Sequence, residues 1–183
     1  MANLDLLTTT EYIFSSSPYA NEFPLQGVQQ IALQEGLRQN AYQDSLGNWT
    51  IGIGHTPAYA GEHWSLDTCF SVFFNDIYKE GYLPVTQNLP WTKTLSKPRF
   101  WVNVNASFNM GFDNWSQFNE TFTAMQSNNL EGVVQGMFSS AWYNQVPDRV
   151  LALAYQYYND TWVLGYLTDQ QKSQFSSQLP NLV

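Results

Sequence analysis

Two short β-prone runs on either side of one polar turn set the strongest limit on how this 183-residue chain can fold. Tyr42 precedes the glycine-containing sequence DSLGN, at 44–48, and Trp49, Ile51 and Ile53 follow it. Runs of this kind around such a turn predict a β-hairpin. The next sequence, TPAYAGEHW, predicts a turn or a third short strand. The β structure is therefore expected to form a small lobe, at about residues 38–66.

Helical patterns enclose this hairpin. The apolar spacing in LQGVQQIALQEGLR predicts a helix from about 26 to 36, and Gly36 weakens its continuation. The next helical pattern runs from residue 66 to about 81, with Asp67 as a cap and a phenylalanine-rich apolar stripe. From residue 84 onward further helical patterns alternate with loops, and Thr168 is the expected N-cap of the last one.

The first 25 residues contain a serine run and two prolines, and they predict an N-terminal arm of uncertain order. Residues 26–183 follow as one domain. The predicted fold class is α+β: a helix, a small β-hairpin lobe and then a larger all-helical lobe.

The charge of the chain excludes several classes of partner. Seven Lys and Arg residues stand against 15 Asp and Glu residues, which gives a net charge of −8. A nucleic-acid partner needs clustered cations, so it is not expected, and long-range attraction to an anionic membrane or cell wall is disfavoured.

No apolar run approaches the ~18 residues of a membrane span, and the N-terminus lacks the pattern of a signal peptide. Cys69 is the single cysteine, so an intramolecular disulfide is impossible, and we expect a small buried side chain. The sequence therefore predicts a soluble protein that is made in a reducing cytoplasm and does not insert into a membrane.

Two carboxylates, Glu35 and Asp44, lie where the predicted helix ends and where the hairpin turns. Cleavage of a glycosidic bond needs such a pair, one protonated to donate to the leaving oxygen and one ionised to orient water. Acids nine residues apart are nevertheless common. Spacing alone favours a solvated helix end and an Asx-turn at 44–47.

The wider sequence changes this balance. EGLR at 35–38, AYQD at 41–44 and TIGIGHT at 50–56 together resemble the phage-type lysozymes. SFNMGFDNW and AWYNQVPDR, the latter at 141–149, resemble two later segments of the same family. The resemblance covers roughly residues 26 to 162. It implies a lysozyme-like fold with an active-site cleft between the small hairpin lobe and the larger helical lobe.

The resemblance also implies roles for individual residues. Glu35 matches the family's general acid, and Asp44 and Thr50 match the pair that holds the attacking water. The family inverts the anomeric centre, which needs the two carboxyls ~6.5–9.5 Å apart to admit water. Arg149 matches the arginine that pairs with the catalytic glutamate.

Supporting residues follow in the same way. His55 matches a histidine that pairs with an acid on the next helix, for which Asp76 is the candidate and Asp67 the alternative. Phe108 matches an aromatic residue that lines the saccharide cleft, although a core role is equally compatible with the sequence. Thr121 falls near a small hydroxyl residue of the cleft.

No metal or cofactor is expected, because the spacing of His55, His63 and Cys69 matches no common zinc pattern. Trp142 is expected in the core. Two departures from the family stand out: the chain is acidic where well-known members are basic, and Gly136 occupies a position where the family often has an asparagine.

The leading hypothesis is a monomeric peptidoglycan muramidase that lyses the bacterial wall for a phage, acting after release from the host cytoplasm or from the virion. A lytic transglycosylase and a non-catalytic wall-binding or structural component of the virion are the alternatives.

Overall fold

The structure, a computed structural model, describes residues 3–44 and 47–180 of the chain. The chain divides into two compact units, residues 1–79 and 80–183. The boundary falls inside a π-helix, η1 (Ile77–Tyr82), that continues α3. Each unit is described separately below.

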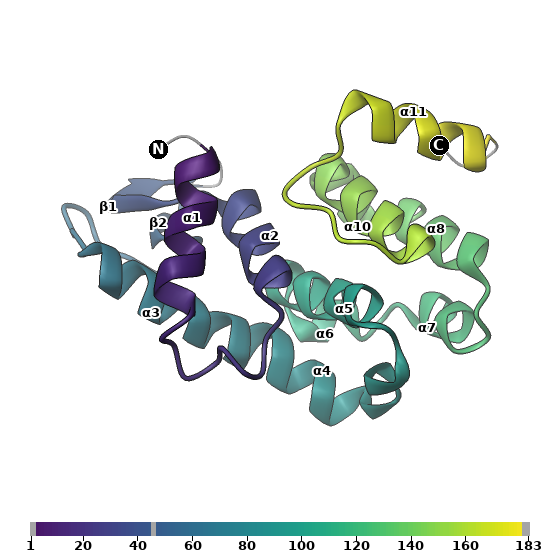
Figure 1. Cartoon of the computed structure of the whole chain (residues 1–183), viewed down its shortest axis with the longest axis horizontal. Coiled ribbons are helices and arrows are strands. Elements are labelled where there is room, and N and C mark those ends of the chain that lie inside the picture. The colour runs from purple at the N-terminus through teal and green to yellow at the C-terminus, as the bar shows by residue number, and fades with distance from the viewer. Residues whose placement is uncertain (1–2, 45–46, 181–183) are drawn as a thin grey trace. The chain divides into compact units, whose positions relative to one another are not determined.

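The first unit combines three helices with one hairpin (Figure 1). Its elements are α1 (Asn3–Phe14), α2 (Leu25–Glu35), β1 (Arg38–Gln43), β2 (Trp49–Gly52) and α3 (Leu66–Asp76). The predicted helix at 26–36 and the predicted hairpin are thus confirmed. The pattern predicted as one helix from residue 66 to about 81 is an α-helix that changes to π-helical hydrogen bonding at Ile77.

Helix α1 packs against α2 and α3. The Phe14 ring contacts the ring of Phe74 edge to face, with centroids 5.4 Å apart. The buried hydroxyl of Thr10 donates a hydrogen bond to the carbonyl of Leu6, and the Gln29 amide on α2 donates to the carbonyl of Leu7. Aromatic packing and hydrogen bonds therefore join α1 to the unit.

The hairpin is a two-stranded antiparallel sheet in which Tyr42 pairs with Thr50 and Arg38 with Gly52. The register is irregular between Arg38 and Tyr42. The TPAYAGEHW segment forms turns, with an isolated bridge between His63 and Asn40 rather than a third strand. The cap of α3 is Ser65, whose side chain accepts a hydrogen bond from the Thr68 amide, and not Asp67 as the sequence suggested.

The second unit is helical in the part of the chain that the structure describes. Its elements are α4 (Leu83–Asn88), the 3₁₀-helix η2 (Pro90–Thr94), α5 (Lys97–Met110), α6 (Phe112–Trp115), α7 (Asn119–Gln126), α8 (Leu130–Phe138), α9 (Ala141–Gln145), α10 (Pro147–Asn159) and α11 (Asp169–Gln178). Helix α10 packs against α5, α8 and α9. Together with the small sheet of the first unit, these helices confirm the predicted α+β, lysozyme-like fold class.

A cluster of aromatic side chains lies within the core of this unit. Trp115 is fully buried and contacts Trp142 and Phe122 edge to face. The Trp142 indole N–H donates to Asn109 Oδ1 at 2.7 Å, which satisfies its one polar group. Trp142 is 5% exposed, so its predicted core position is confirmed.

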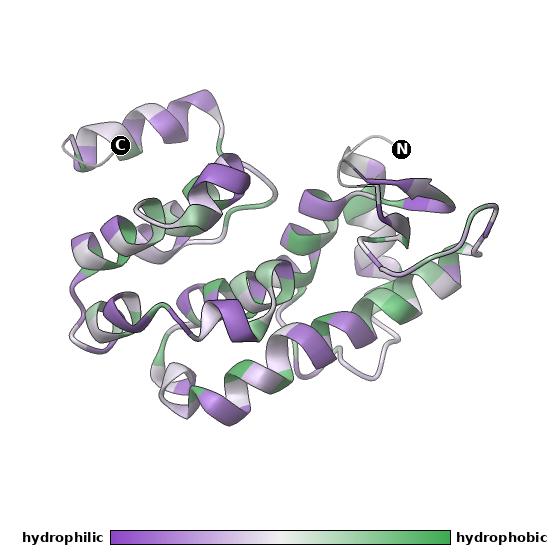
Figure 2. Ribbon diagram, turned by 180° about the vertical axis from the view of Figure 1, so that it is seen from behind, coloured by the Kyte–Doolittle hydropathy of each residue, from purple (hydrophilic) through white to green (hydrophobic). Residues whose placement is uncertain are grey.

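Helix α11 is largely hydrophilic (Figure 2), and an aromatic residue packs it against the rest of the unit. Phe175 is fully buried and contacts the Tyr155 ring with centroids 5.4 Å apart. At the other end of the helix, Thr168 and Gln171 form a capping box, which confirms the predicted N-cap. No helix within residues 3–44 and 47–180 has the length and hydropathy to cross a lipid bilayer.

Candidate active site

Glu35 is the last residue of α2, where the helix stops because Gly36 has φ +74. The Gly36 amide still donates to the carbonyl of Ala32 at 2.9 Å. A positive φ suits glycine far better than other residues, so the chain turns sharply after the glutamate. The Glu35 side chain is half-buried at this turn.

The Glu35 carboxyl lies directly against the backbone of Gly54. A β-carbon built on Gly54 would lie 2.9 Å from Glu35 Oε2 and 3.1 Å from its Cδ. Gly54 also has φ +74, so two independent constraints favour glycine there. The GIGH segment therefore brings the backbone after β2 close to the carboxyl at the end of α2.

Asp44 closes the hairpin turn through Asn48. Its Oδ1 accepts from the Asn48 amide N–H at 2.8 Å, and its Oδ2 accepts from the Asn48 side-chain amide at 3.2 Å. The Asp44 amide in turn donates to the Asn48 carbonyl at 2.9 Å. The two residues between Asp44 and Gly47, within the predicted Asx-turn, lie outside the described residues. These two bonds occupy two of the about four acceptor sites of an ionised carboxylate.

Thr50 lies on β2 and is 4% exposed. Its hydroxyl donates a long hydrogen bond, 3.4 Å, to the carbonyl of Asn48. Asn48 therefore contacts both Asp44 and Thr50, and it orients the hairpin end of the candidate site.

Tyr42, opposite Thr50 on β1, is influenced by both candidate carboxylates. Burial raises the pKa of its phenol, and the charges of Glu35 and Asp44 add to that rise. Arg38 acts in the opposite direction, since its guanidinium carbon lies 4.1 Å from the centroid of the Tyr42 ring. Glu35 and Asp44 thus act on one tyrosine within the same unit.

The His55 and Asp76 side chains are in contact. His55 Nδ1 lies 2.7 Å from Asp76 Oδ2, and the imidazole also packs near the ring of Trp64. Burial raises the pKa of the Asp76 carboxyl, while the hydrogen bond and charge of His55 lower it in part. Asp67, the alternative partner, is exposed in the first turn of the same helix.

The remaining candidates belong to the second unit. Arg149 lies in the first turn of α10 and is 4% exposed. Phe108 is half-buried on α5. A β-carbon built on Gly81 would lie 3.4 Å from the Cβ atom of Phe108. Because Glu35 belongs to the other unit, the pairing of Arg149 with Glu35 remains a prediction, as does the cleft.

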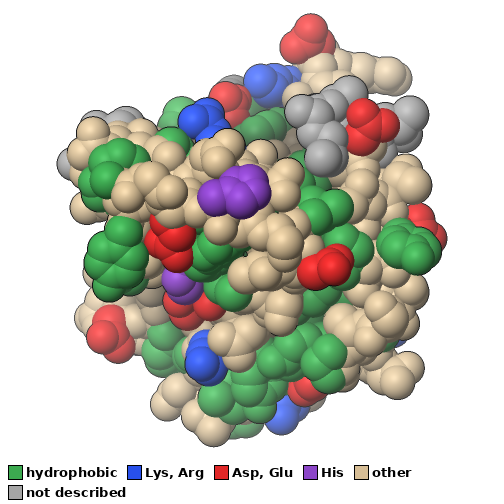
Figure 3. Space-filling model, turned by 90° about the vertical axis from the view of Figure 1, so that its left-hand side faces the viewer, with side chains coloured by type: hydrophobic (Ala, Val, Ile, Leu, Met, Phe, Trp, Pro, Cys, Tyr) green, Lys and Arg blue, Asp and Glu red, His purple; other side chains and the backbone are tan. Residues whose placement is uncertain are grey.

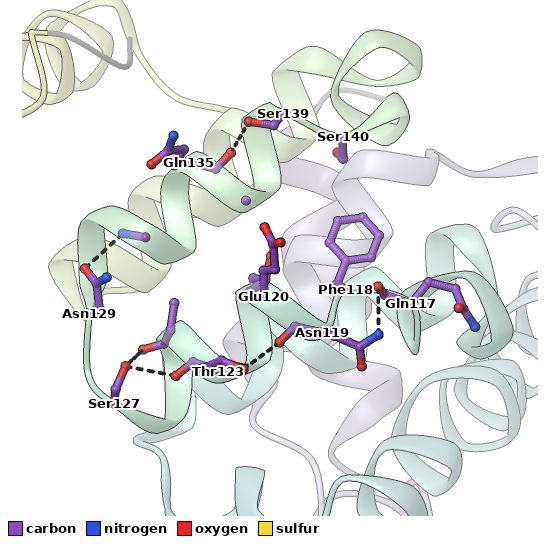
Figure 4. Close-up of a pocket in the computed structure, with 14 residues that line it drawn as sticks. Gln117, Phe118, Asn119, Glu120, Thr123, Ser127, Asn129, Gln135, Ser139 and Ser140 are labelled. Carbon is purple, nitrogen blue, oxygen red and sulfur yellow. Dashed lines mark hydrogen bonds between the residues drawn. The ribbon is translucent and has the colours of Figure 1, made fainter.

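Thr121 lies on α7 beside Gly136 of α8, and both line a pocket of about 770 Å³. Figure 4 shows the polar side chains of this pocket, including Glu120, Gln117 and Gln135. A β-carbon on Gly136 would lie 2.2 Å from Thr121 Oγ1, so the two helices approach closely at this point. The absence of a side chain at Gly136 thus permits the close approach of α7 and α8.

The described residues contain no group of three or more His, Cys, Asp or Glu side chains arranged to hold a metal ion. Cys69 is fully buried, as predicted, and burial raises the pKa of its thiol. On the face shown in Figure 3, acidic side chains are scattered among hydrophobic and uncharged ones.

Sequence reasoning missed the contacts that support these residues. Gly54, Asn48 and Trp64 touch Glu35, Asp44 and His55 respectively. The glycine spacing in GIGH is a signal for a close backbone approach, and the DSLGN turn is a signal for side-chain hydrogen bonds. Neither signal identifies which residue makes the contact.

Among the described residues, many helices and one small antiparallel sheet make up an α+β fold of the lysozyme-like class. The phage lysozyme family model matches residues 32–156, about two thirds of the chain. The chain belongs to the phage lysozyme family.

The peptidoglycan hydrolase gp36 of Pseudomonas phage phiKMV is 28% identical to this chain over 136 residues. The match covers 67% of this chain and 14% of that relative, so the chain spans only a small part of the relative's length.

Proposed function

We propose that this protein is a peptidoglycan hydrolase, and specifically a muramidase. It cleaves the β-1,4 bond between N-acetylmuramic acid and N-acetylglucosamine with inversion. The observation that carries this proposal is the pair of carboxylates in one unit of a phage lysozyme family member, Glu35 at the end of α2 and Asp44 at the hairpin turn. The printed function of the phiKMV relative supports the same substrate.

In the proposed reaction Glu35 donates its proton to the glycosidic oxygen as the bond to the anomeric carbon breaks. A water held by Asp44 and Thr50 attacks that carbon from the opposite face and gives its proton to Asp44. The hydrogen bonds from Asn48 to both Asp44 oxygens support this role, because they fix the orientation of the carboxylate. The contact with Gly54 supports a fixed position for Glu35.

The other residues have proposed supporting roles. Arg149 pairs with Glu35, and His55 with Asp76 anchors the segment that follows β2 to α3. Phe108 and Thr121 contact the saccharide, and the polar pocket beside Thr121 supports this assignment. Residues 26–183 form the catalytic domain, and the segment before residue 26 is an addition to it.

The proposed biological setting is lysis of a bacterial host by a phage. The protein acts as a monomer on the glycan strands of the wall, after release from the host cytoplasm or from the virion. Family membership and the phage origin of the relative support this setting.

Digestion of purified peptidoglycan followed by mass spectrometry and NMR of the products tests the proposal. We expect muropeptides with reducing N-acetylmuramic acid ends that are first released as the α-anomer. Anhydro-muramyl ends would instead identify a lytic transglycosylase. Binding to the wall without any product, over a full range of pH and salt, would identify a non-catalytic component.

A further inference from the structure

A second pocket of the helical unit, of about 520 Å³, lies apart from every residue assigned above. Four segments that are distant in the sequence build it: η2, the start of α5, the end of α7 with the turn after it, and the end of α10. Its volume is within the ~300–1,000 Å³ range of small-ligand sites. The side chains that matter here are Trp91, Arg99, Asn128 and Asp160, called the Trp91 pocket below.

The polar groups of the Trp91 pocket are held in place by the protein. The Arg99 Nε–H donates to the carbonyl of Tyr157 at 2.9 Å, and the guanidinium carbon lies 5.3 Å from the centroid of the Tyr157 ring. One oxygen of Asp160 accepts a hydrogen bond from the Ser96 hydroxyl. These contacts use the Nε of the arginine and one carboxylate oxygen. The two terminal nitrogens of the guanidinium and the other carboxylate oxygen can therefore bond to a ligand.

The backbone adds to this preorganisation. Asn128 has φ +55 and Asp160 has φ +51, and these are the non-glycine residues with positive φ among those that the structure describes. Both line the Trp91 pocket. Asparagine and aspartate tolerate this conformation better than other side chains, and here it presents an amide and a carboxylate to the same space.

The chemistry of these groups suits a neutral sugar. Arginine, aspartate and asparagine are planar and can each bond two neighbouring hydroxyls, while an aromatic ring offers an apolar face for the C–H groups of a pyranose. Trp91 is half-buried and contacts Phe122 edge to face, which fixes the indole. One cation and one anion balance within the pocket, so its charge does not select a charged ligand.

The surrounding charge favours contact with a bacterial wall at this position. Besides Arg99, which Asp160 balances, residues 81–112 contain Lys93 and Lys97 and no acidic residue, in a chain with a net charge of −8. This part of the chain therefore repels an anionic polymer least.

We propose that the Trp91 pocket is a second, non-catalytic binding site for an N-acetylated sugar unit of the glycan strand. The proposal rests on the proposed function for the identity of the strand. A second weak site on the same polymer raises the effective concentration of the enzyme at the wall, which offsets the electrostatic repulsion of an acidic chain.

Titration of the ¹⁵N-labelled full chain with chitotriose, followed by NMR, tests the proposal. We expect shifts of the Trp91 indole, the Asn128 amide and the Arg99 Nε–H signals, with a Kd on the order of 1 mM, as weak single sites give.

Asn128→Gly keeps the positive φ and removes the side-chain amide, so it should weaken chitotriose binding at least ~5-fold without unfolding the turn. Arg99→Gln should weaken binding similarly. Lys172→Gln removes the same charge at the exposed ion pair with Asp148, and it should leave the affinity for chitotriose unchanged.

Three results would overturn the second site: no shift of these reporters at saturating chitotriose, equal shifts with adenosine, or wild-type affinity in both pocket variants. Hydrolysis of peptidoglycan is measured separately on the wild-type chain. Hydrolysis without shifts at the Trp91 pocket refutes the second site alone, whereas shifts without hydrolysis refute the proposed muramidase activity alone.

Discussion

The two units of this protein differ in how they use charge. The first, residues 1–79, has eight acidic and two basic residues, whereas the larger second unit has seven and five. In the first unit the carboxylates of interest lie at a helix end and a turn, where short-range contacts orient them. In the second unit aliphatic and aromatic side chains form the core, and polar side chains line pockets between helices.

This difference suggests a division of labour. Proton transfer needs carboxylates in distinct, well-oriented environments, which helix ends and turns provide at little cost in core packing. Sugar binding needs wide surfaces with fixed polar groups, and packed helices provide these. The proposed chemistry therefore belongs mainly to the first unit, and the proposed saccharide contacts belong largely to the second.

The sharpest test of this division is a matched pair of substitutions. Glu35→Gln removes the proposed proton donor of the first unit and should lower the rate of wall lysis ~10²–10⁴-fold, the usual contribution of general acid catalysis. Glu131→Gln makes the same change at an exposed position of the second unit and should leave the rate unchanged. Lysis rates and thermal unfolding of both variants are compared, and a fully active, folded Glu35→Gln protein would contradict the assignment.

Stability at alkaline pH should depend on the second unit. Burial raises the pKa of Tyr157 to about 12 from 10.0. The folded state therefore keeps this proton longer than the unfolded state, and the stabilisation that is complete below pH 10 is lost as pH rises toward 12. A shift of this size corresponds to about 3 kcal/mol. Chemical unfolding of wild type and Tyr157→Phe across this range measures it, and parallel pH profiles would show that Tyr157 is not responsible.

The close approach of α7 and α8 predicts a coupled pair. Gly136→Ala places a methyl group against Thr121 Oγ1 and should lower the free energy of unfolding by ~1–3 kcal/mol, the usual cost of overpacking. Combined with Thr121→Ala the clash disappears, and the alanine should then stabilise the helix by up to ~1 kcal/mol. A double-mutant cycle measures the coupling; additive effects would mean that the helices do not meet there.

The smallest expected effect comes from two glycine substitutions in the first unit. Their comparison distinguishes the effect of backbone strain from the effect of displacing a carboxylate. Gly54→Ala and Gly61→Ala both place alanine at positive φ and should each cost ~1–2 kcal/mol of stability. A β-carbon at Gly54 meets the Glu35 carboxyl, whereas one at Gly61 meets nothing within 4 Å. The Gly54 variant should therefore lose about tenfold more activity than the Gly61 variant, which corresponds to ~1.4 kcal/mol in the activation free energy. Equal activities would show that the contact does not position Glu35.

Much of the local structure could be predicted. The polar turn between two β-prone runs defined the hairpin, and the apolar spacing before Gly36 defined α2, because these signals depend on neighbouring residues. The cap of α3 was predicted wrongly, since Asp67 and Ser65 are both suitable residues and only the helix start decides between them. The roles of Glu35, Asp44 and Thr50 came from a resemblance and remain proposals.

The sequence by itself determined the hairpin, helix α2, the family and the residue types available for chemistry, because these depend on periodicity, turn residues and motifs along the chain. Only the tertiary structure decided that Gly54 meets Glu35, that Gly136 meets Thr121 and that four distant segments enclose the Trp91 pocket. Such contacts depend on how whole faces pack, and no local pattern encodes which residue lies opposite another.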